Sequence, residues 1–249
     1  MANTFSKHRG DSSNYRRTQT SAPRSGGGKS AATRPKQQSR SRFGTRRQPE
    51  ESRAAILRAA VAEFAEYGIA GARTDRMAHS AGVNKALLYY YFKDKDSLYE
   101  AVLDHVFRGL RDRVMPVFES QLEPRAKLLE YVARYFDYIA ANPRFPRVVQ
   151  SEWMRAGAHV NPQMLRVARE YFAPIYKRMG ELLQEGAEKG QLRRMNPMDF
   201  IPTVVGIVIF YFSSVPAMKS LLKVDPLSKA RIAERRKFVL AFIEEAVCL

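Results

Sequence analysis

The chain is poor in the residues that metal centres and disulfide frameworks need. Its 249 residues include one cysteine, Cys248, and four scattered histidines. A single cysteine can form neither an internal disulfide nor a cysteine-based metal site, and the histidines lack metal-ligand spacing. The sequence therefore predicts no disulfide and no metal centre, and it fits a reducing, cytoplasmic compartment.

Catalytic and nucleotide-binding motifs are also missing. The sequence has no G-x-S-x-G elbow, no P-loop and no dinucleotide fingerprint. Gly26–Gly28 with Lys29 resembles a phosphate loop in composition only, because no strand or helix pattern surrounds it. Paired carboxylates such as Glu244 and Glu245 fit a solvated helix face. We therefore expect no enzymatic activity, no catalytic residues and no cofactor.

Acidic residues are scarce at the N-terminus. Residues 1–49 carry 12 Lys and Arg against one acid, Asp11, and so account for +11 of the formal net charge of +17. This stretch is rich in Ser, Gly, Arg and Gln and lacks apolar periodicity, which predicts a disordered basic arm. Such an arm suits salt-sensitive contact with nucleic acid. A solubilising tail, a misassigned start of the reading frame and an organelle transit peptide remain alternatives. No secretory signal is expected, because no apolar run follows the basic residues.

Strand patterns are absent after Pro49. Apolar residues recur there at helical spacing, with no sustained alternation of apolar and polar residues. We expect Gly68 to end the first helix, Pro116 to stop the fourth and Pro174 to interrupt the seventh. The fold class predicted is all-α, with about nine helices over about 49–67, 74–80, 84–92, 94–114, 124–141, 145–156, 162–189, 198–222 and 226–247.

A helix-turn-helix pattern occupies residues 74–92, TDRMAHSAGVNKALLYYYF. Gly82 can supply the positive φ of a tight turn, and Leu88 and Phe92 lie four residues apart and so face the core together. The same register points Lys85, Ala86, Tyr89 and Tyr90 outward and leaves Tyr91 intermediate.

An exposed face of this kind fits the major groove of DNA. Lysine can donate to guanine, tyrosine can reach bases or phosphates, and Ala86 allows close approach. Leu87 can contact a thymine methyl group, and Lys95 at the start of the next helix is placed to meet a phosphate. Packing of the tyrosines on the following helix is the alternative for part of each ring.

The stretch GARTDRMAHSAGVNKALLYYYFKDKDSLYEAVL closely resembles the DNA-binding signature of the tetracycline-repressor (TetR) family. The resemblance covers roughly residues 52–103 and rests on the AGV turn, LYYYF and FKDKDSL. It implies a helix-turn-helix DNA-binding domain over 50–92 and a larger ligand-binding and dimerisation domain over 93–249. It also implies base contacts from Lys85, Ala86, Leu87, Tyr90 and Tyr91 and backbone contacts from Thr74, Tyr89 and Lys95.

Two positions depart from the family pattern. Leu87 stands where the family often has Thr or another small or polar residue, and Tyr91 stands where it often has His. The operator sequence therefore cannot be carried over. Residues 50–100 hold 8 acidic and 7 basic side chains, so placed residues rather than bulk charge must supply affinity. Arg46 and Arg47, just before the first helix, are candidates for minor-groove contact.

Residues 200–218 run for 19 residues without a charge. Length makes this stretch a membrane-span candidate, but Pro202 and Pro216 flank it and two serines lie inside. A helix buried against a second copy explains the same composition. In proteins resembling TetR the last two long helices pair across a dimer, which here implies a homodimer through about 198–222 and 226–247 and no membrane partner.

The middle helices are rich in aromatic residues, which in most helical proteins form core. In this family the corresponding region encloses an inducer pocket, which implies an apolar or aromatic small-molecule effector. The expected lining residues are Tyr135, Trp153, Met154, Phe172 and Tyr176, with Gln150 or Glu152 as a polar anchor.

The resemblance implies a homodimeric repressor that binds a palindromic operator in double-stranded DNA and is released by this effector. It would be cytoplasmic, and nucleoid-associated when bound to DNA. A non-specific basic DNA-binding protein and a membrane-anchored regulator remain alternatives.

Overall fold

Helices dominate the computed structural model, which describes residues 49–156 and 162–249; the side chains of 151–156 are not described. Apart from Pro49, the expected basic arm, with Arg46 and Arg47, lies outside these ranges. Within them the only β-type pairing is one isolated bridge, Leu192 with Cys248. The predicted all-α class is confirmed.

The first three helices have nearly the bounds that the sequence predicts. They are α1 (Pro49–Gly71), α2 (Thr74–Ala81) and α3 (Lys85–Tyr91). Gly68 has φ of 61° and ψ of 178°, so α1 kinks there and adds a short turn before it ends. Only glycine adopts such a backbone conformation without strain, which explains why the break falls at this residue.

The next three helices begin at clear signals. The helix α4 (Lys95–Phe118) starts at a capping box. The Asp94 carboxylate accepts a hydrogen bond from the Ser97 N–H, and the Ser97 hydroxyl oxygen accepts one from the Asp94 N–H. The helix continues through Pro116, so the expectation that this proline stops the helix is wrong. Pro116 lies in the last turn, where the missing N–H costs one terminal hydrogen bond. The helices α5 (Pro124–Ala141) and α6 (Phe145–Ala156) match their predicted bounds.

Within the described ranges, two of the long predicted helices are broken into shorter ones. The stretch 162–189 forms α7 (Pro162–Val167), a π-helical turn η1 (Ala168–Phe172) and α8 (Ala173–Glu188). Pro174 has no N–H for the helical ladder, and the Ala173 N–H bonds to the Ala168 carbonyl across the widened turn. The stretch 198–222 divides into α9 (Pro197–Ser213) and α10 (Val215–Leu222), bent by 52°, and α11 (Lys229–Val247) follows.

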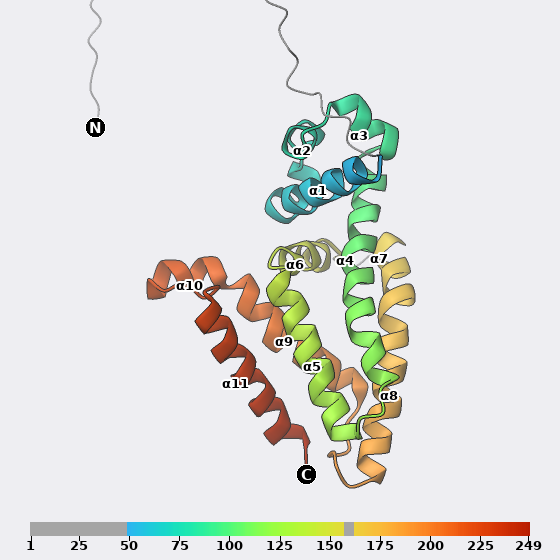
Figure 1. The fold of residues 1–249 in the computed structure, drawn as a ribbon, viewed down its shortest axis with the longest axis vertical. Helices are drawn as coiled ribbons and strands as arrows, with labels where there is room; N and C mark the ends of the chain where they lie inside the picture. The colour runs from blue at the N-terminus through green and yellow to red at the C-terminus, as the bar shows by residue number, and fades with distance from the viewer. Residues whose placement is uncertain (1–48, 157–161) are drawn as a thin grey trace, which may run out of the picture. The chain divides into compact units, whose positions relative to one another are not determined.

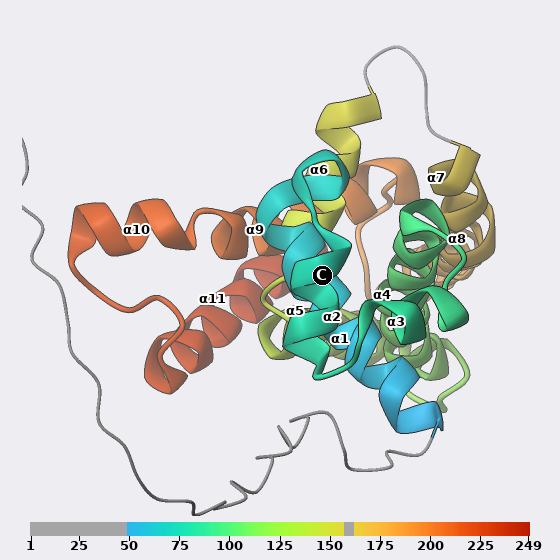
Figure 2. The same cartoon turned by 90° about the horizontal axis from the view of Figure 1, so that it is seen from above.

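The helices pack around one continuous apolar core. Helix α1 packs on α2, α4 and α6, and α4 runs on between α5 and α8. Helix α5 also contacts α9 and α11, and the view from above shows α10 extending away from the other helices (Figures 1 and 2). The long α4 thus has one end under α1–α3 and the other among the helices that follow.

No single helix in the described ranges is long and apolar enough to cross a membrane. The bent pair α9 and α10 passes that test by length and composition only, as a core helix can.

Candidate nucleic-acid interface and internal cavity

The turn between α2 and α3 has the geometry that the sequence predicts. Gly82 ends α2 with φ of 68° and ψ of 32°, and its N–H donates to the carbonyls of Ala78 and His79. Asn84 then caps α3 by accepting a hydrogen bond of 2.7 Å from the Leu87 N–H. A glycine and an asparagine thus set the entry angle of α3.

The four consecutive rings of α3 divide between core and solvent. Leu88 and Phe92 are buried, whereas Tyr89 and Tyr90 are 41% and 80% exposed. Lys85 and Ala86 are also exposed, and Leu87 and Tyr91 are half-buried against the core. The Tyr90 and Tyr91 rings meet edge to face at 5.3 Å, so the half-buried ring supports the exposed one.

Two polar contacts join the exposed face of α3 to α2. The Lys85 ammonium lies 2.8 Å from the Asp75 carboxylate, and both groups are solvent-exposed. Hydrogen bonding to Asp75 raises the pKa of Lys85, and the same contact lowers the pKa of Asp75. The Thr74 and Tyr89 hydroxyls lie 3.2 Å apart. In the free protein the charge of Lys85 is therefore partly neutralised, and binding to DNA would exchange Asp75 for a base or phosphate.

Lys95 is engaged with backbone rather than directed outward. Its ammonium lies 3.5 Å from the carbonyl oxygens of Ala70 and Ala72, between α1 and α2. These contacts are at the long limit for hydrogen bonds. A phosphate within reach would compete with them effectively because it carries a full negative charge.

One buried acid holds α2 against α1. Glu63 on α1 accepts hydrogen bonds from the Arg76 guanidinium at 2.6 Å and from the Arg73 N–H at 2.9 Å. Arg76 also lies over the Tyr67 ring at 4.1 Å. The α2–α3 unit is thus fixed to α1 at its first turn, which keeps the exposed face of α3 in a constant orientation.

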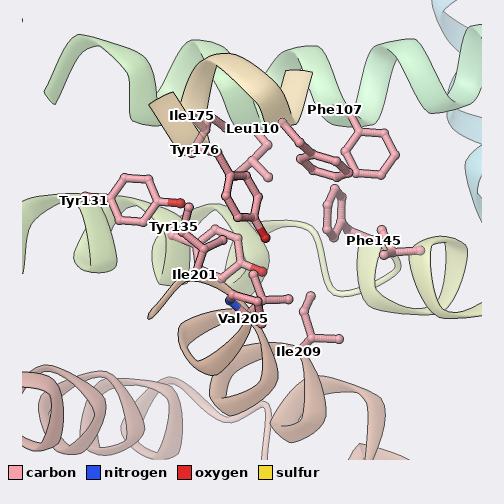
Figure 3. Close-up of a pocket in the computed structure, with 13 residues that line it drawn as sticks. Phe107, Leu110, Tyr131, Tyr135, Phe145, Ile175, Tyr176, Ile201, Val205 and Ile209 are labelled. Carbon is pink, nitrogen blue, oxygen red and sulfur yellow. The ribbon is translucent and has the colours of Figure 1, made fainter. Parts of the chain in front are cut away.

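An apolar internal cavity lies among α4, α5, α6, η1, α8 and α9 (Figure 3). Its empty space is about 650 Å³ with the open mouth included. In Figure 3 the Tyr176 ring projects from α8 across the cavity toward the side chains of α9. Among the described residues no charged side chain lines the cavity, whose residues are Phe107, Leu110, Tyr131, Tyr135, Phe145, Val149, Phe172, Ile175, Tyr176, Ile201, Pro202, Val205 and Ile209.

Three tyrosine hydroxyls are the polar groups of this lining. Within the described part of the chain, the hydroxyls of Tyr131, Tyr135 and Tyr176 have no hydrogen-bond partner, although Tyr131 and Tyr135 are each only 4% exposed. Burial raises the pKa of all three, so each stays a neutral donor and acceptor. Three hydroxyls without a protein partner around one cavity offer donors and acceptors to a ligand's polar atom.

Some of the residues expected to line the cavity do so, and Gln150 does not. Tyr135, Phe172 and Tyr176 line it, and Trp153, Met154 and Glu152 have side chains outside the described set. Gln150 is solvent-exposed near the middle of α6 and does not line the cavity, so it is not the polar anchor. The helical register explains this, because Val149 beside it occupies the inward position. Tyr131, which sequence reasoning passed over, lies four residues before Tyr135 on the same face of α5.

The helix α4 connects the cavity to the DNA-reading helices, because it lines the cavity and also packs on α1. Phe107 and Leu110 of α4 line it, and the α4 residue Asp104 accepts hydrogen bonds from Arg166 at 2.8 Å and Tyr171 at 3.1 Å. Tyr171 belongs to η1, as does the lining residue Phe172. A molecule in the cavity would therefore touch both α4 and η1, which the hydrogen bond from Tyr171 to Asp104 joins.

Comparison with known proteins places both halves of the chain in one family. Residues 56–102 match the family model of bacterial regulatory proteins of the tetR family. Residues 124–243 match the model of the tetracyclin repressor-like C-terminal domain.

Individual relatives agree with the family models. The HTH-type transcriptional repressor SCO4008 of Streptomyces coelicolor is 34% identical over 71% of this chain and 85% of its own length. The HTH-type transcriptional repressor NicS of Pseudomonas putida is 27% identical over 77% of this chain and 90% of its own.

Solved structures show the same fold. The putative transcriptional regulator SCO4942 from Streptomyces coelicolor superposes with a TM-score of 0.57 at 27% identity, covering 79% of this chain and 98% of that one. The ketosteroid regulator KstR2 of Mycobacterium tuberculosis has a TM-score of 0.65 over 79% of this chain and 95% of that one, and at 18% identity it shows the fold alone. On the matched domains and the relatives' sequences together, this chain belongs to the TetR family of transcriptional regulators, which are DNA-binding proteins and not enzymes.

Proposed function

We propose that this DNA-binding regulator is a homodimeric repressor that leaves a palindromic operator when a small, largely apolar molecule enters the internal cavity. The observation that carries the proposal is an apolar cavity that borders α4 and presents the hydroxyls of Tyr131, Tyr135 and Tyr176, which have no hydrogen-bond partner among the described residues. A ligand's polar atom can pair with these hydroxyls, and its apolar part can contact the rest of the lining.

The DNA-reading part in this proposal is residues 50–92. Base contacts come from the exposed face of α3, with Lys85, Ala86 and Tyr90 at its centre and Leu87 and Tyr91 at its edge. Thr74, Tyr89 and Lys95 surround this face and supply contacts to the DNA backbone. The remaining described residues, within 93–249, form the ligand and dimer part.

A second copy is proposed to pack on the outer faces of α9 and α11. Phe210 is 74% exposed on α9, and Phe238 and Phe242 are 56% and 48% exposed on α11. Three phenylalanines exposed on adjacent helices form an apolar surface of the kind that a partner covers. Twofold symmetry then places two copies of α3 about 34 Å apart, which matches successive major grooves of a palindromic site.

The effector class follows from the lining. Since no charged side chain among the described residues lines the cavity, an ionic ligand would lose its hydration there without compensation from them. A flat or compact apolar molecule carrying one or two hydroxyl, carbonyl or ester groups pairs with the hydroxyls of Tyr131, Tyr135 and Tyr176. Binding that favours another position of α4 lowers operator affinity by the ligand's differential affinity for the two states.

The proposal is tested first with DNA and then with ligands. The protein is titrated by fluorescence anisotropy against the intergenic DNA beside its own gene, at near-physiological salt, with scrambled competitor DNA. Operator-specific binding survives the competitor, whereas non-specific basic binding is erased by it.

A neutral apolar library is then screened for compounds that release the operator. The proposal predicts that effective compounds bind Tyr135→Phe or Tyr176→Phe several-fold more weakly than the unaltered protein. Compounds that bind the cavity and leave operator affinity unchanged would contradict the induction mechanism while leaving DNA binding intact.

A further inference from the structure

A second cavity, separate from the apolar one, lies where α1 meets the helices beneath it. We name it the junction cavity. It holds about 670 Å³ of empty space, its open side included. Its walls come from α1, α4, α5, α6 and the α5–α6 connection, and its residues are Arg58, Val61, His105, Val106, Tyr138, Ala141, Asn142, Pro143, Arg144 and Phe145.

The junction cavity is lined by two arginines from separate parts of the fold. Arg58 comes from α1 and Arg144 from the α5–α6 connection, and no acidic residue among the described residues lines the cavity. Among the described residues, neither arginine has an acidic partner within ion-pair distance. The neighbouring Arg147 does have one, since it lies 2.6 Å from Glu66. Two unpaired guanidinium groups facing one cavity from separate elements create a positive potential without its counter-charge.

The remaining surface of the junction cavity suits an apolar group. Val61, Val106 and Phe145 provide aliphatic and aromatic walls. The Tyr138 hydroxyl donates to the Val106 carbonyl at 2.6 Å, and the Asn142 amide donates to the Tyr138 carbonyl at 2.8 Å. Both side chains are thus fixed, so the floor of the cavity is preorganised.

We propose that the junction cavity binds a small organic anion, a molecule with a carboxylate or phosphate group and a compact apolar part. The anionic group lies between the guanidinium groups of Arg58 and Arg144, which match carboxylate and phosphate oxygens in geometry and charge. The apolar part rests on Val61, Val106 and Phe145. Such a ligand bridges α1 to α4 and α6, so it acts on the joint between the DNA-reading helices and the rest of the protein. The apolar cavity is proposed to take neutral ligands and the junction cavity anionic ones, so one ligand is not expected to bind in both.

Binding is measured by isothermal titration calorimetry on the full chain, with benzoate and phenyl phosphate as probes and benzyl alcohol as the neutral analogue. Arg58→Gln and Arg144→Gln each remove one guanidinium group. Arg113→Gln is the matched control, because Arg113 is exposed on α4, outside the cavity and without an acidic partner among the described residues. Val205→Phe, which narrows the apolar cavity, distinguishes the two sites.

The expected result is saturable binding of at least one anionic probe and none of benzyl alcohol at the same concentrations. Arg58→Gln and Arg144→Gln each weaken binding of the anionic probe by about tenfold, while Arg113→Gln and Val205→Phe leave it unchanged. Both arginines are solvent-exposed, so both variants are expected to fold, and Arg144 lies in a connection rather than in a helix.

Three results would overturn the proposal. One is the absence of binding for both anions, and another is equal binding in all arginine variants. The third is loss of binding in Val205→Phe alone, which would place the probe in the apolar cavity. None of these results depends on operator binding, so the proposed function can stand or fall separately.

Discussion

Tyr90 shows how one side chain can matter to function and be neutral to stability. Its ring is 80% exposed at the tip of α3 and contacts only its neighbour Tyr91 among aromatic residues. Replacement by alanine removes the proposed base contact and little buried area. We expect Tyr90→Ala to weaken operator binding by about 1–3 kcal/mol with an unchanged melting temperature, as measured by anisotropy and calorimetry.

A second variant separates the parts of this side chain. Tyr90→Phe keeps the ring and loses the hydroxyl, so it shows which of the two reads DNA. If both variants bind the operator with unchanged affinity, Tyr90 does not contact DNA.

Asp75 is expected to oppose the proposed DNA contact of Lys85. Its carboxylate lies 2.8 Å from the Lys85 ammonium and brings a negative charge to the face that we propose meets DNA. We expect Asp75→Asn to raise operator affinity a few-fold, with the gain largest at low salt, because electrostatic contributions are screened as salt increases. Anisotropy titrations over a salt series measure this effect.

The matched control is Asp112→Asn, which removes a carboxylate that pairs with Arg111 on α4. A fall in affinity for Asp75→Asn, with the control unchanged, would mean that Asp75 orients Lys85 for its base contact.

At the scale of one helix, α5 carries tyrosines with opposite energetic roles. The buried side chains of Tyr131 and Tyr135 line the apolar cavity and their hydroxyls have no partner among the described residues, whereas the Tyr138 hydroxyl donates to the Val106 carbonyl at 2.6 Å. Burial raises the pKa of Tyr138 to about 12, so this phenol remains a donor. The helix therefore combines two ligand-facing positions with one structural position.

This contrast predicts opposite stability changes for the same chemical substitution. Tyr135→Phe removes an unpaired polar atom and should leave the free energy of unfolding unchanged or raise it by up to about 1 kcal/mol. Tyr138→Phe removes a made hydrogen bond and leaves the Val106 carbonyl unpaired, which should cost about 1–2 kcal/mol. Urea denaturation of the two variants measures the difference. Equal losses would show that Tyr135 already has a partner, such as a bound water.

At the scale of the whole molecule, the protein is proposed to act as a homodimer. Phe210 and Phe242 lie exposed on α9 and α11, where a second copy would cover them. We expect Phe210→Glu with Phe242→Glu to produce a monomer in sedimentation velocity and to abolish tight operator binding, because a single α3 reads only one half-site.

Leu122→Glu serves as the control, since Leu122 is 45% exposed in the connection before α5. A doubly substituted protein that remains dimeric would place the interface elsewhere on the surface.

The sequence by itself determined the local features of this protein. The glycine turn at Gly82, the inward register of Leu88 and Phe92 and the exposure of Tyr90 depend on residues within one or two helical turns, and all three are confirmed. The bounds of α5 and α6 follow from Pro124 and from Asn142 with Pro143 in the same way. Local steric and hydrogen-bonding preferences act over a few residues, so they can be read from the sequence.

Tertiary structure alone decided which side chains meet. The pairing of Lys85 with Asp75, the anchoring of α2 by Glu63 and the exposure of Gln150 depend on how helices are turned toward one another. The apolar cavity gathers residues from α4 to α9, and the aromatic composition of the middle helices could not distinguish its lining from ordinary core. The physical reason is that a cavity is the space that packing leaves unfilled, and it belongs to the arrangement of helices rather than to any one segment.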